Sequence, residues 1–220
     1  MKFTKDEIRR AMLLYAVTDR TWLRAGETLP QVTERVLQSG ATFLQLREKA
    51  LGRDALLAEA MALKALCVRY HVPFVVNDDV NVAIWSGADG VHVGQSDIQG
   101  RDVRALIGPD RILGISANTV ETAVAAERAG ADYIGVGAVF STSTKRDAKT
   151  LSLRELREIC AAVSIPVVAI GGISGDNVRQ LAGSGIDGVA VVSAIYAQPD
   201  PAAATAELLA RLKDAVAAHG

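Results

Sequence analysis

Short apolar runs alternate with helical patterns along this chain, and no other feature of the sequence limits the fold as strongly. Several runs, such as residues 167–170, are unbroken by polar residues, as in strands that are covered on both faces. We expect strands near residues 13–17, 42–46, 74–77, 90–93, 111–115, 132–137, 167–170 and 188–192. We expect helices near residues 29–39, 53–70, 80–86, 101–107, 119–129, 152–162, 175–183 and 201–218. The alternation predicts an α/β fold built on a parallel sheet.

A three-residue pattern recurs before three of the expected strands. It reads Gly87-Ala88-Asp89, Gly130-Ala131-Asp132 and Gly185-Ile186-Asp187, and each copy would join a helix end to the next strand through a tight turn. Eight strand–helix units in 220 residues predict a single-domain (β/α)8 TIM barrel over residues 1–220. The same alternation also permits a doubly wound open sheet.

The ends of the chain and its composition narrow the class of protein. Thr4, followed by Asp6 and Glu7, predicts a short capped helix at the N-terminus instead of a signal peptide. The net charge is −1, from 24 basic and 25 acidic residues, which argues against nucleic-acid or membrane-surface partners. Cys67 and Cys160 are expected to be small buried side chains without a disulfide. We therefore expect a cytoplasmic protein with no membrane partner.

Polar residues gather where the second expected strand ends. Gln45, Arg47 and Lys49 alternate there, so a continuing strand would place them on one face, with Leu46 and Glu48 on the other. Two cations and an amide suit phosphate oxygens, because arginine offers a fork of donors and lysine a point charge. The alternative is a solvated strand end in which Arg47 or Lys49 pairs with Glu48.

Carboxylates follow the third and fourth expected strands. Asp78 and Asp97 would come from neighbouring strands and could bind Mg²⁺, which uses one or two carboxylates together with substrate phosphate. Asp79 could instead cap the helix that begins at Val80. His92 lies between valines within a strand, so we interpret it as a hydrogen-bonded core histidine.

Hydroxyl groups and a third cation follow the fifth and sixth strands. Ser116 could serve as a neutral donor to substrate or merely as a cap. Small residues at Thr142, Ser143 and Thr144 would let backbone N–H groups approach an anion, and Lys145 would add positive charge. A solvated charged loop is the alternative for Lys145.

The last two strands are followed by glycines and a serine. Gly171 and Gly172 come after the seventh strand and Ser193 after the eighth. In (β/α)8 barrels these loops, with the start of a short extra helix, commonly form a phosphate site. The sequence contains no Gly-x-Ser-x-Gly elbow, CxxC pair or P-loop, so those chemistries lack support.

These motifs together resemble the thiamine-phosphate synthase family over nearly the whole chain. They are Gln45-Leu46-Arg47-Glu48-Lys49, Val76-Asn77-Asp78-Asp79, Asp89-Gly90-Val91-His92-Val93-Gly94-Gln95 with Asp97, Gly114-Ile115-Ser116, Thr142-Ser143-Thr144-Lys145, Ile170-Gly171-Gly172-Ile173 and Val192-Ser193-Ala194-Ile195. The resemblance implies a (β/α)8 barrel and a Mg²⁺-dependent transferase. Its reaction would join a hydroxymethylpyrimidine diphosphate to a thiazole phosphate, giving thiamine monophosphate and diphosphate.

The resemblance also implies a role for each site residue. The pyrimidine diphosphate would be bound by Gln45, Leu46, Arg47, Glu48, Lys49, Asn77, Ser116 and Lys145. Of these, Arg47, Lys49, Ser116 and Lys145 would be catalytic. The metal would be held by Asp78 and Asp97, and the thiazole phosphate by Thr142, Ser143, Thr144, Gly172, Val192 and Ser193. The partners would be small phosphorylated molecules, and assembly into a homo-oligomer is left open.

The sequence differs from the family pattern in two loops, and two alternative functions remain. The family commonly has prolines where this chain has Ala138 and Ser141, and often histidine where Asn118 stands, so the geometry of these loops is open. One rival is a thiazole tautomerase, which would share the fold and need an acid/base residue such as histidine at the pocket. The other is a catalytically silent phosphate-binding protein, which would have little reason to keep both carboxylates and three cations.

Overall fold

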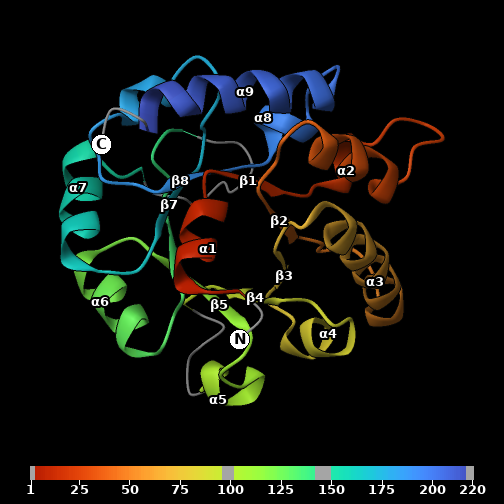
Figure 1. The fold of residues 1–220 in the computed structure, drawn as a ribbon, viewed down its shortest axis with the longest axis horizontal. Helices are drawn as coiled ribbons and strands as arrows, with labels where there is room; N and C mark the ends of the chain where they lie inside the picture. The colour runs from red at the N-terminus through yellow and green to blue at the C-terminus, as the bar shows by residue number, and fades with distance from the viewer. Residues whose placement is uncertain (1–2, 96–101, 142–149, 217–220) are drawn as a thin grey trace.

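Eight parallel strands close into a barrel in the computed structural model, which describes residues 3–95, 102–141 and 150–216 (Figure 1). Each strand pairs with the next along the chain, and the last pairs with the first, with Tyr15 opposite Ala190. The strands are β1 Leu14–Val17, β2 Phe43–Leu46, β3 Phe74–Asn77, β4 Gly90–Val93, β5 Ile112–Ala117, β6 Tyr133–Val136, β7 Val167–Ile170 and β8 Gly188–Val191. The closed ring confirms the predicted (β/α)8 fold and excludes the open sheet.

Helices surround the barrel and fill the connections between strands. The α-helices are α1 Lys5–Ala11, α2 Leu29–Gln38, α3 Arg53–Tyr70, α4 Val80–Trp85, α5 Val103–Ile107, α6 Val120–Arg128, α7 Leu153–Ala162, α8 Ser193–Tyr196 and α9 Pro201–Val216. Two short 3₁₀ helices are η1 Arg20–Trp22 and η2 Val178–Leu181. Within the described ranges, no helix is both long and apolar enough to cross a membrane.

One predicted helix is wrong in kind and length. The helix expected over 175–183 is only the 3₁₀ helix η2, whose N–H groups bond three residues back, as from Gln180 to Asn177. Asn177 makes no side-chain cap for it, and Gly183 and Gly185 beyond its end both have positive φ. The segment therefore cannot propagate into a full α-helix.

The strands separate two hydrophobic cores because successive side chains point to opposite faces. Phe43, Val75 and Val168 pack inside the barrel with other inward residues. Their neighbours Leu44 and Val76 pack outside it, beneath the surrounding helices. Residue position along a strand therefore decides whether a side chain belongs to the interior or to the outer shell.

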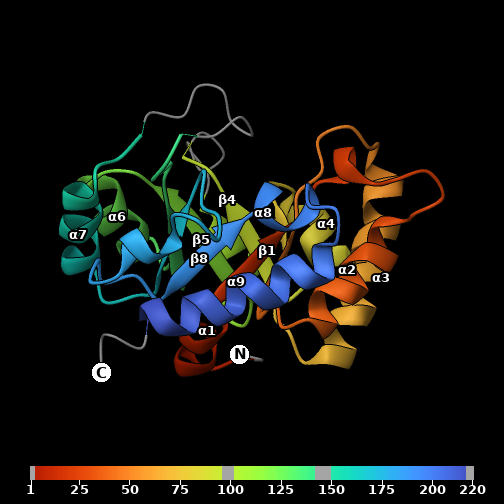
Figure 2. The ribbon, with the colours of Figure 1, turned by 90° about the horizontal axis from the view of Figure 1, so that it is seen from above.

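The N-terminal helix α1 closes one end of the barrel. Its Ile8 and the following Met12 are almost completely buried and belong to the interior core. Figure 1 shows α1 over the centre of the ring, and Figure 2 shows it at one end of the molecule. Thr4 and Glu7 form a reciprocal capping box at the start of this helix, which confirms the predicted capped helix. The strands finish at the opposite end of the barrel, which we call the mouth, and the predicted site residues that the structure describes lie at or after the strand ends there.

The recurring glycine–aspartate pattern makes a specific backbone contact at the strand starts. Asp89 donates its N–H to the carbonyl oxygen of Phe74 (2.8 Å), and its carboxylate accepts the N–H of that residue (3.0 Å). Asp132 binds Leu113, and Asp187 binds Val167, in the same two-bond manner. We call these contacts strand clamps, because each joins the start of one strand to the start of the strand before it.

A cation neutralises each aspartate of the strand clamps. Lys64 donates to both carboxylate oxygens of Asp89 at 2.7 Å, and Arg104 donates to Asp132 at 2.6 Å. Arg9 pairs with Asp187 at 2.5 Å. These partners remove most of the cost of placing carboxylates at the edge of a core.

A fourth clamp uses a hydroxyl instead of a carboxylate. Thr42 donates its N–H to the carbonyl of Leu14 (2.8 Å), and its Oγ1 accepts the N–H of Leu14 (2.8 Å). A glycine two residues before each clamp residue turns the chain in the left-handed region, as at Gly40 (φ 106°) and Gly130 (φ 83°). The clamps therefore occur at β2, β4, β6 and β8, before every second strand.

The two cysteines are free thiols. Cys67 is buried and Cys160 is half-buried. Burial raises the pKa of both thiols to about 12. The free thiols and the burial of Cys67 agree with the prediction, whereas Cys160 is less buried than expected.

Candidate active site

Polar side chains replace apolar ones in the upper interior of four neighbouring strands. They are Gln45 of β2, Asn77 of β3, His92 of β4 and Ser116 of β5. On β3 and β5 each lies beyond an apolar inward residue, Val75 and Ile112 respectively, which belongs to the interior core. The register places Asn77 beside His92 across the β3–β4 pair. The structure thus brings three predicted site residues, together with His92, to one side of the barrel mouth.

An unbroken hydrogen-bonded chain crosses the barrel between two of these residues. Gln45 Nε2 donates to the Tyr15 hydroxyl (2.6 Å), which lies 2.8 Å from the Tyr133 hydroxyl. The Tyr133 hydroxyl lies 3.0 Å from His92 Nδ1, and His92 Nε2 lies 3.0 Å from Ser116 Oγ. We call these five side chains the interior chain. His92 is therefore hydrogen-bonded in the interior, as predicted, and it also contacts a predicted site residue.

Two glycines leave the space that the interior chain occupies. A Cβ added at Gly114 of β5 would lie 2.2 Å from Tyr133 Cζ and 2.5 Å from His92 Nδ1. One added at Gly135 of β6 would lie 3.2 Å from His92 Cε1. Glycine within a strand weakens it and often marks a close approach by another group. Here the approaching groups are the imidazole and the phenol.

The two buried tyrosines keep their protons. Tyr15 and Tyr133 are 1% and 0% exposed, and burial raises the pKa of each hydroxyl above its ordinary value. For Tyr133 the neighbouring Tyr15 raises the pKa further. Both side chains are therefore neutral groups that can donate one hydrogen bond and accept another.

The cations after β2 lie beyond the end of the strand. Because β2 ends at Leu46, Arg47 and Lys49 are in the following loop, and only Gln45 is fixed by strand geometry. Among the described residues neither Arg47 nor Lys49 has an ion-pair partner, and Lys49 is exposed. Strand alternation therefore supports the predicted face for Gln45 alone and does not extend to Arg47 and Lys49.

Glu48 pairs with a residue that the sequence did not suggest. Its carboxylate binds Arg20, which also binds Glu59 of α3, and it accepts the backbone N–H groups of Lys49 and Ala50. The alternative in which Glu48 neutralises the side chain of Arg47 or Lys49 is not what the structure contains.

The side chains of Leu46 and Glu48 make contacts within the protein that do not involve the predicted site residues. Leu46 is fully buried in the outer core, on the face away from the interior. Any contact of Leu46 with substrate would have to use its backbone, and a contact of Glu48 would have to compete with Arg20. These two residues are therefore the least supported members of the predicted pyrimidine-diphosphate set.

The two aspartates after β3 have different roles. Asp79 accepts the N–H of Val82 (2.9 Å) and caps α4, as the alternative interpretation predicted. Asp78 is exposed and has φ 63°, an uncommon conformation for a residue other than glycine. Asn77 Nδ2 donates to Asp78 Oδ2 (2.6 Å), and His92 O accepts the backbone N–H of Asp78 (2.8 Å). These bonds hold the Asp78 carboxylate beside the mouth.

The residues at this position suit a hard divalent cation that also binds a substrate. Asp78 supplies an exposed carboxylate, while Asp97 lies outside the described residues. In the parts of the chain that the structure describes, no group of three or more His, Cys, Asp or Glu side chains could enclose a metal. A single protein carboxylate is enough for Mg²⁺, because this ion fills its other coordination positions with water and substrate phosphate oxygens.

The mouth above β7 and β8 is built mainly from backbone. Gly171 and Gly172 follow β7 with φ 99° and 66°, and Asn177 Nδ2 donates to the carbonyl of Gly172 (2.8 Å). A Cβ at Gly172 would lie 2.3 Å from the carbonyl oxygen of Ser141, so the loop after β6 packs directly on this turn. Ser193 begins the short helix α8 after β8, and the preceding Val192 contacts the interior core.

Five predicted site residues lie outside the described residues. They are Asp97, Thr142, Ser143, Thr144 and Lys145. The loop between β6 and this segment is described, and it contains both positions where the family commonly has proline. Ala138 follows Gly137 through a cis peptide bond, and its carbonyl accepts the N–H of Leu151 (2.7 Å).

Sequence reasoning missed three groups near the mouth. Tyr15 and Tyr133 look like ordinary core aromatics in their strands, and their hydroxyl partners lie far away in sequence. Gln95 donates to the backbone carbonyl of Ser116 (2.6 Å) and helps to position the end of β5. The available signal was the pair Gly114 and Gly135, since glycine inside a buried strand indicates that something else needs the space.

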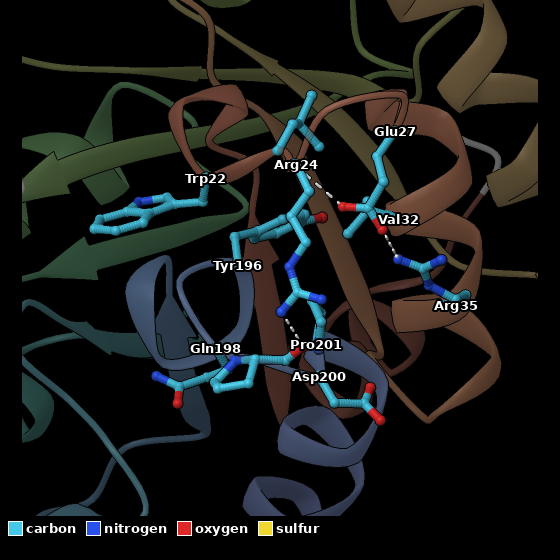
Figure 3. A pocket seen from close by; sticks show the side chains of 11 residues that line it. Trp22, Arg24, Glu27, Val32, Arg35, Tyr196, Gln198, Asp200 and Pro201 are labelled. Carbon is cyan, nitrogen blue, oxygen red and sulfur yellow. Dashed lines mark hydrogen bonds and ion pairs between the residues drawn. The ribbon is translucent and has the colours of Figure 1, made fainter.

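A separate hollow of about 320 Å³ lies between η1, α2 and the segment joining α8 to α9 (Figure 3). Trp22, Arg24 and Arg35 line it, but none of the predicted site residues does. Arg35 pairs with Glu27 at 2.6 Å, and Arg24 donates to the carbonyl of Pro199. The two cations of this hollow are thus engaged by the protein itself, whereas Arg47 and Lys49 have no ion-pair partner within the described ranges.

Comparison with known proteins gives consistent matches. The family model described as thiamine monophosphate synthase matches residues 14–195. Thiamine-phosphate synthase of Ruminiclostridium cellulolyticum is 49% identical over 196 residues, which cover 89% of this chain and 93% of that protein. The corresponding protein of Clostridium tetani is 46% identical over 195 residues, with the same coverage.

A solved structure is similar over almost the full length. Thiamine phosphate pyrophosphorylase from Pyrococcus furiosus has a TM-score of 0.87 and 37% identity, covering 95% of this chain and 99% of that one. The closed barrel and these relatives define a (β/α)8-barrel enzyme of the transferase class. The chain belongs to the thiamine monophosphate synthase family.

Proposed function

We propose that this enzyme is a Mg²⁺-dependent thiamine-phosphate synthase. Its substrates would be 4-amino-2-methyl-5-(diphosphooxymethyl)pyrimidine and a thiazole phosphate, and its products thiamine monophosphate and diphosphate. The observation that carries the proposal is the division of the mouth. Polar side chains and two cations without ion-pair partners among the described residues follow β2–β5, whereas glycine turns and a short helix follow β7 and β8.

The reaction breaks one bond and forms another without any change of oxidation state. The bond between the pyrimidine methylene carbon and the diphosphate oxygen breaks, and its electron pair leaves with diphosphate. The thiazole nitrogen then uses its lone pair to form the new carbon–nitrogen bond. The aminopyrimidine ring can carry positive charge, so a dissociative path is reasonable, and no nucleophilic side chain is needed.

The side chains after β2–β5 would stabilise the departing diphosphate. Arg47 and Lys49 would bind its oxygens as negative charge develops there, which is an effective form of catalysis in a site closed to water. Lys145, outside the described residues, would add a third cation. Gln45, Asn77 and Ser116 would orient the substrate so that the reacting atoms meet in line.

Mg²⁺ would be held by Asp78 and Asp97 and would neutralise charge on the diphosphate oxygens. The support for this assignment is the exposed Asp78 carboxylate, positioned by Asn77. On the other side of the mouth, Thr142, Ser143, Thr144, Gly172, Val192 and Ser193 would bind the thiazole phosphate through backbone N–H groups and hydroxyls.

The remaining parts of the proposal concern the setting of the enzyme. We propose small phosphorylated molecules as its partners, a cytoplasmic location and no nucleic-acid or membrane partner, with the assembly state left open. The near balance of 24 basic and 25 acidic residues supports the absence of a nucleic-acid or membrane-surface partner.

One incubation tests the proposed function. Purified protein is mixed with both substrates and Mg²⁺, and diphosphate release is followed by ³¹P NMR, with a chelator in a parallel sample. We expect diphosphate and thiamine monophosphate in equal amounts, a strong loss of rate with chelator, and little activity from Asp78→Ala. Isomerisation of the thiazole alone, or binding without turnover, would replace this proposal by one of its two rivals.

A further inference from the structure

We propose that Tyr15, Tyr133 and His92 are positioning residues that fix the direction of the interior chain and so present the Ser116 hydroxyl to substrate as a hydrogen-bond donor. The identity of that substrate rests on the proposed function, but the direction of the chain does not. The chain joins side chains from five strands, β1, β2, β4, β5 and β6, and ends at two predicted site residues.

The Gln45 amide donor sets the direction, because each phenol or serine hydroxyl beyond it has only one hydrogen to donate. Gln45 Nε2 donates to Tyr15, so the Tyr15 hydrogen is available for the Tyr133 oxygen 2.8 Å away. The Tyr133 hydrogen is then available for His92 Nδ1 at 3.0 Å. Each hydroxyl in the chain thereby accepts one hydrogen bond and donates one.

The histidine passes the direction on to the serine. With Nδ1 accepting, neutral His92 carries its hydrogen on Nε2, which lies 3.0 Å from Ser116 Oγ. Ser116 therefore accepts from His92, and its own hydrogen is left for another acceptor. A diphosphate oxygen and a ring nitrogen of an aminopyrimidine are both acceptors of this kind.

The packing indicates that the chain is a built feature of the interior. Tyr133 and Tyr15 are fully buried and Gln45 is 5% exposed, so water does not compete for their bonds. Gly114 has no room for a Cβ, because Tyr133 and His92 occupy that space. Burial keeps both phenols protonated by raising their pKa values, so the hydrogens that define the direction are retained.

The alternative to this proposal is an interior chain whose hydrogen bonds all run in the reverse direction. If the Gln45 amide were turned so that its oxygen faced Tyr15, every bond would reverse, and Nδ1 of His92 would carry the hydrogen. Ser116 would then donate to His92 and could only accept from substrate. The tautomer of His92 therefore reports the direction of the whole chain.

The first experiment reads that tautomer in the free protein. The chain has three histidines, His71, His92 and His219, so ¹⁵N NMR of the imidazoles is simple to assign with a His92→Gln variant. We expect the Nε2–H tautomer for His92 at neutral pH. The Nδ1–H tautomer would overturn the proposal. Since no substrate is added, this result is independent of the proposed reaction.

The second experiment cuts the chain at its middle. Tyr133→Phe removes one buried hydroxyl and leaves the ring, so we expect loss of the single tautomer and about a tenfold fall in kcat/KM for the pyrimidine diphosphate. The KM for the thiazole phosphate should not change. Unchanged tautomer and kinetics would overturn the proposal.

A matched variant separates positioning from general stability. Thr33 is fully buried on α2, and its hydroxyl lies 3.1 Å from the Tyr196 hydroxyl, outside the interior chain. Thr33→Val should lower stability about as much as Tyr133→Phe, yet keep the tautomer and the kinetic constants. Equal kinetic losses in the two variants would reduce the chain to a structural role and refute the proposal.

A third comparison tests the donor that faces Ser116. His92→Gln can still offer an N–H near Ser116, whereas His92→Leu cannot. We expect the glutamine variant to retain about tenfold more kcat/KM than the leucine variant, with both folded by circular dichroism. Equal activities would show that a donor at this position is not needed.

Discussion

Charged residues lie at both ends of the eight strands, but within the described part of the chain those at the strand starts are paired with other protein groups and those compared with them at the strand ends are not. At the strand starts, Asp89, Asp132 and Asp187 each bind a backbone N–H and a basic side chain. At the strand ends, Arg47 and Lys49 have no ion-pair partner among the described residues.

This difference teaches how one fold separates stability from function. A charge that is satisfied inside the protein stabilises the fold, and its removal leaves a buried partner unpaired. A charge that lacks a protein partner contributes little to folding and is available to a ligand. Substitutions at the two ends should therefore have opposite signatures in stability and in catalysis.

The largest effect is expected at the strand starts. Asp89→Ala leaves Lys64 and the N–H of Phe74 without their carboxylate, so we expect a loss of about 3–5 kcal/mol in unfolding free energy. The melting temperature should fall by roughly 6–20 °C. Calorimetry measures the loss of stability. Kinetics at a temperature below the unfolding transition should show an unchanged kcat. Glu158→Ala, at an exposed ion pair on α7, is the control.

The second effect is expected at the strand ends. Arg47→Ala should lower kcat by about 10²–10³, as for other donors that stabilise charge in a transition state. Its unfolding free energy should stay within about 0.5 kcal/mol of the wild-type value. Arg69→Ala, at an exposed pair with Glu34, should change neither quantity. A stability loss without a kinetic loss for Arg47→Ala would contradict the comparison.

The third effect tests the division within the mouth itself. Ser193→Asp places a carboxylate at the start of α8, so we expect about a 10–100-fold weaker affinity for the thiazole phosphate because like charges repel. Binding of the pyrimidine diphosphate should suffer far less. Calorimetric titration with each ligand decides, and equal losses for both would show that the mouth is not divided in this way.

The smallest effect sharpens the comparison at the strand starts. Thr42→Val removes the hydroxyl that accepts the N–H of Leu14, but no ion pair is broken. We expect a loss of about 1 kcal/mol, clearly less than for Asp89→Ala. Denaturation of the two variants side by side measures the difference. A loss as large as that of Asp89→Ala would mean that the backbone contact, and not the charge, dominates the clamps.

The sequence predicted the barrel well because its signals are local. Continuous apolar runs, helix caps and the glycine–aspartate pattern all act within a few residues, and they located all eight strands. The segment 175–183 failed because a periodic pattern does not reveal that two glycines with positive φ, Gly183 and Gly185, and a missing cap limit it to one 3₁₀ turn.

The site was predicted less completely because its geometry depends on contacts between distant strands. The ion pair of Glu48 with Arg20 joins residues 28 apart, and the contact of Tyr15 with Tyr133 joins residues 118 apart. Neither follows from residue type or spacing. Alternation correctly placed Gln45, but β2 ends at Leu46 as expected, so alternation does not extend to Arg47.

The strand clamps divide the barrel into four modules, each a strand, a helical connection and a second strand. The clamp bonds span only 15 to 28 residues, and each lies inside one module. A circular permutant opened at Gly108–Asp110, between the second and third modules, would keep all four clamps. One opened at Ser86–Ala88 would place new termini beside Asp89 and split a module. Circular permutants opened between modules should therefore be more stable than those opened within a module, so tolerance to new termini should alternate from one connection to the next around the barrel.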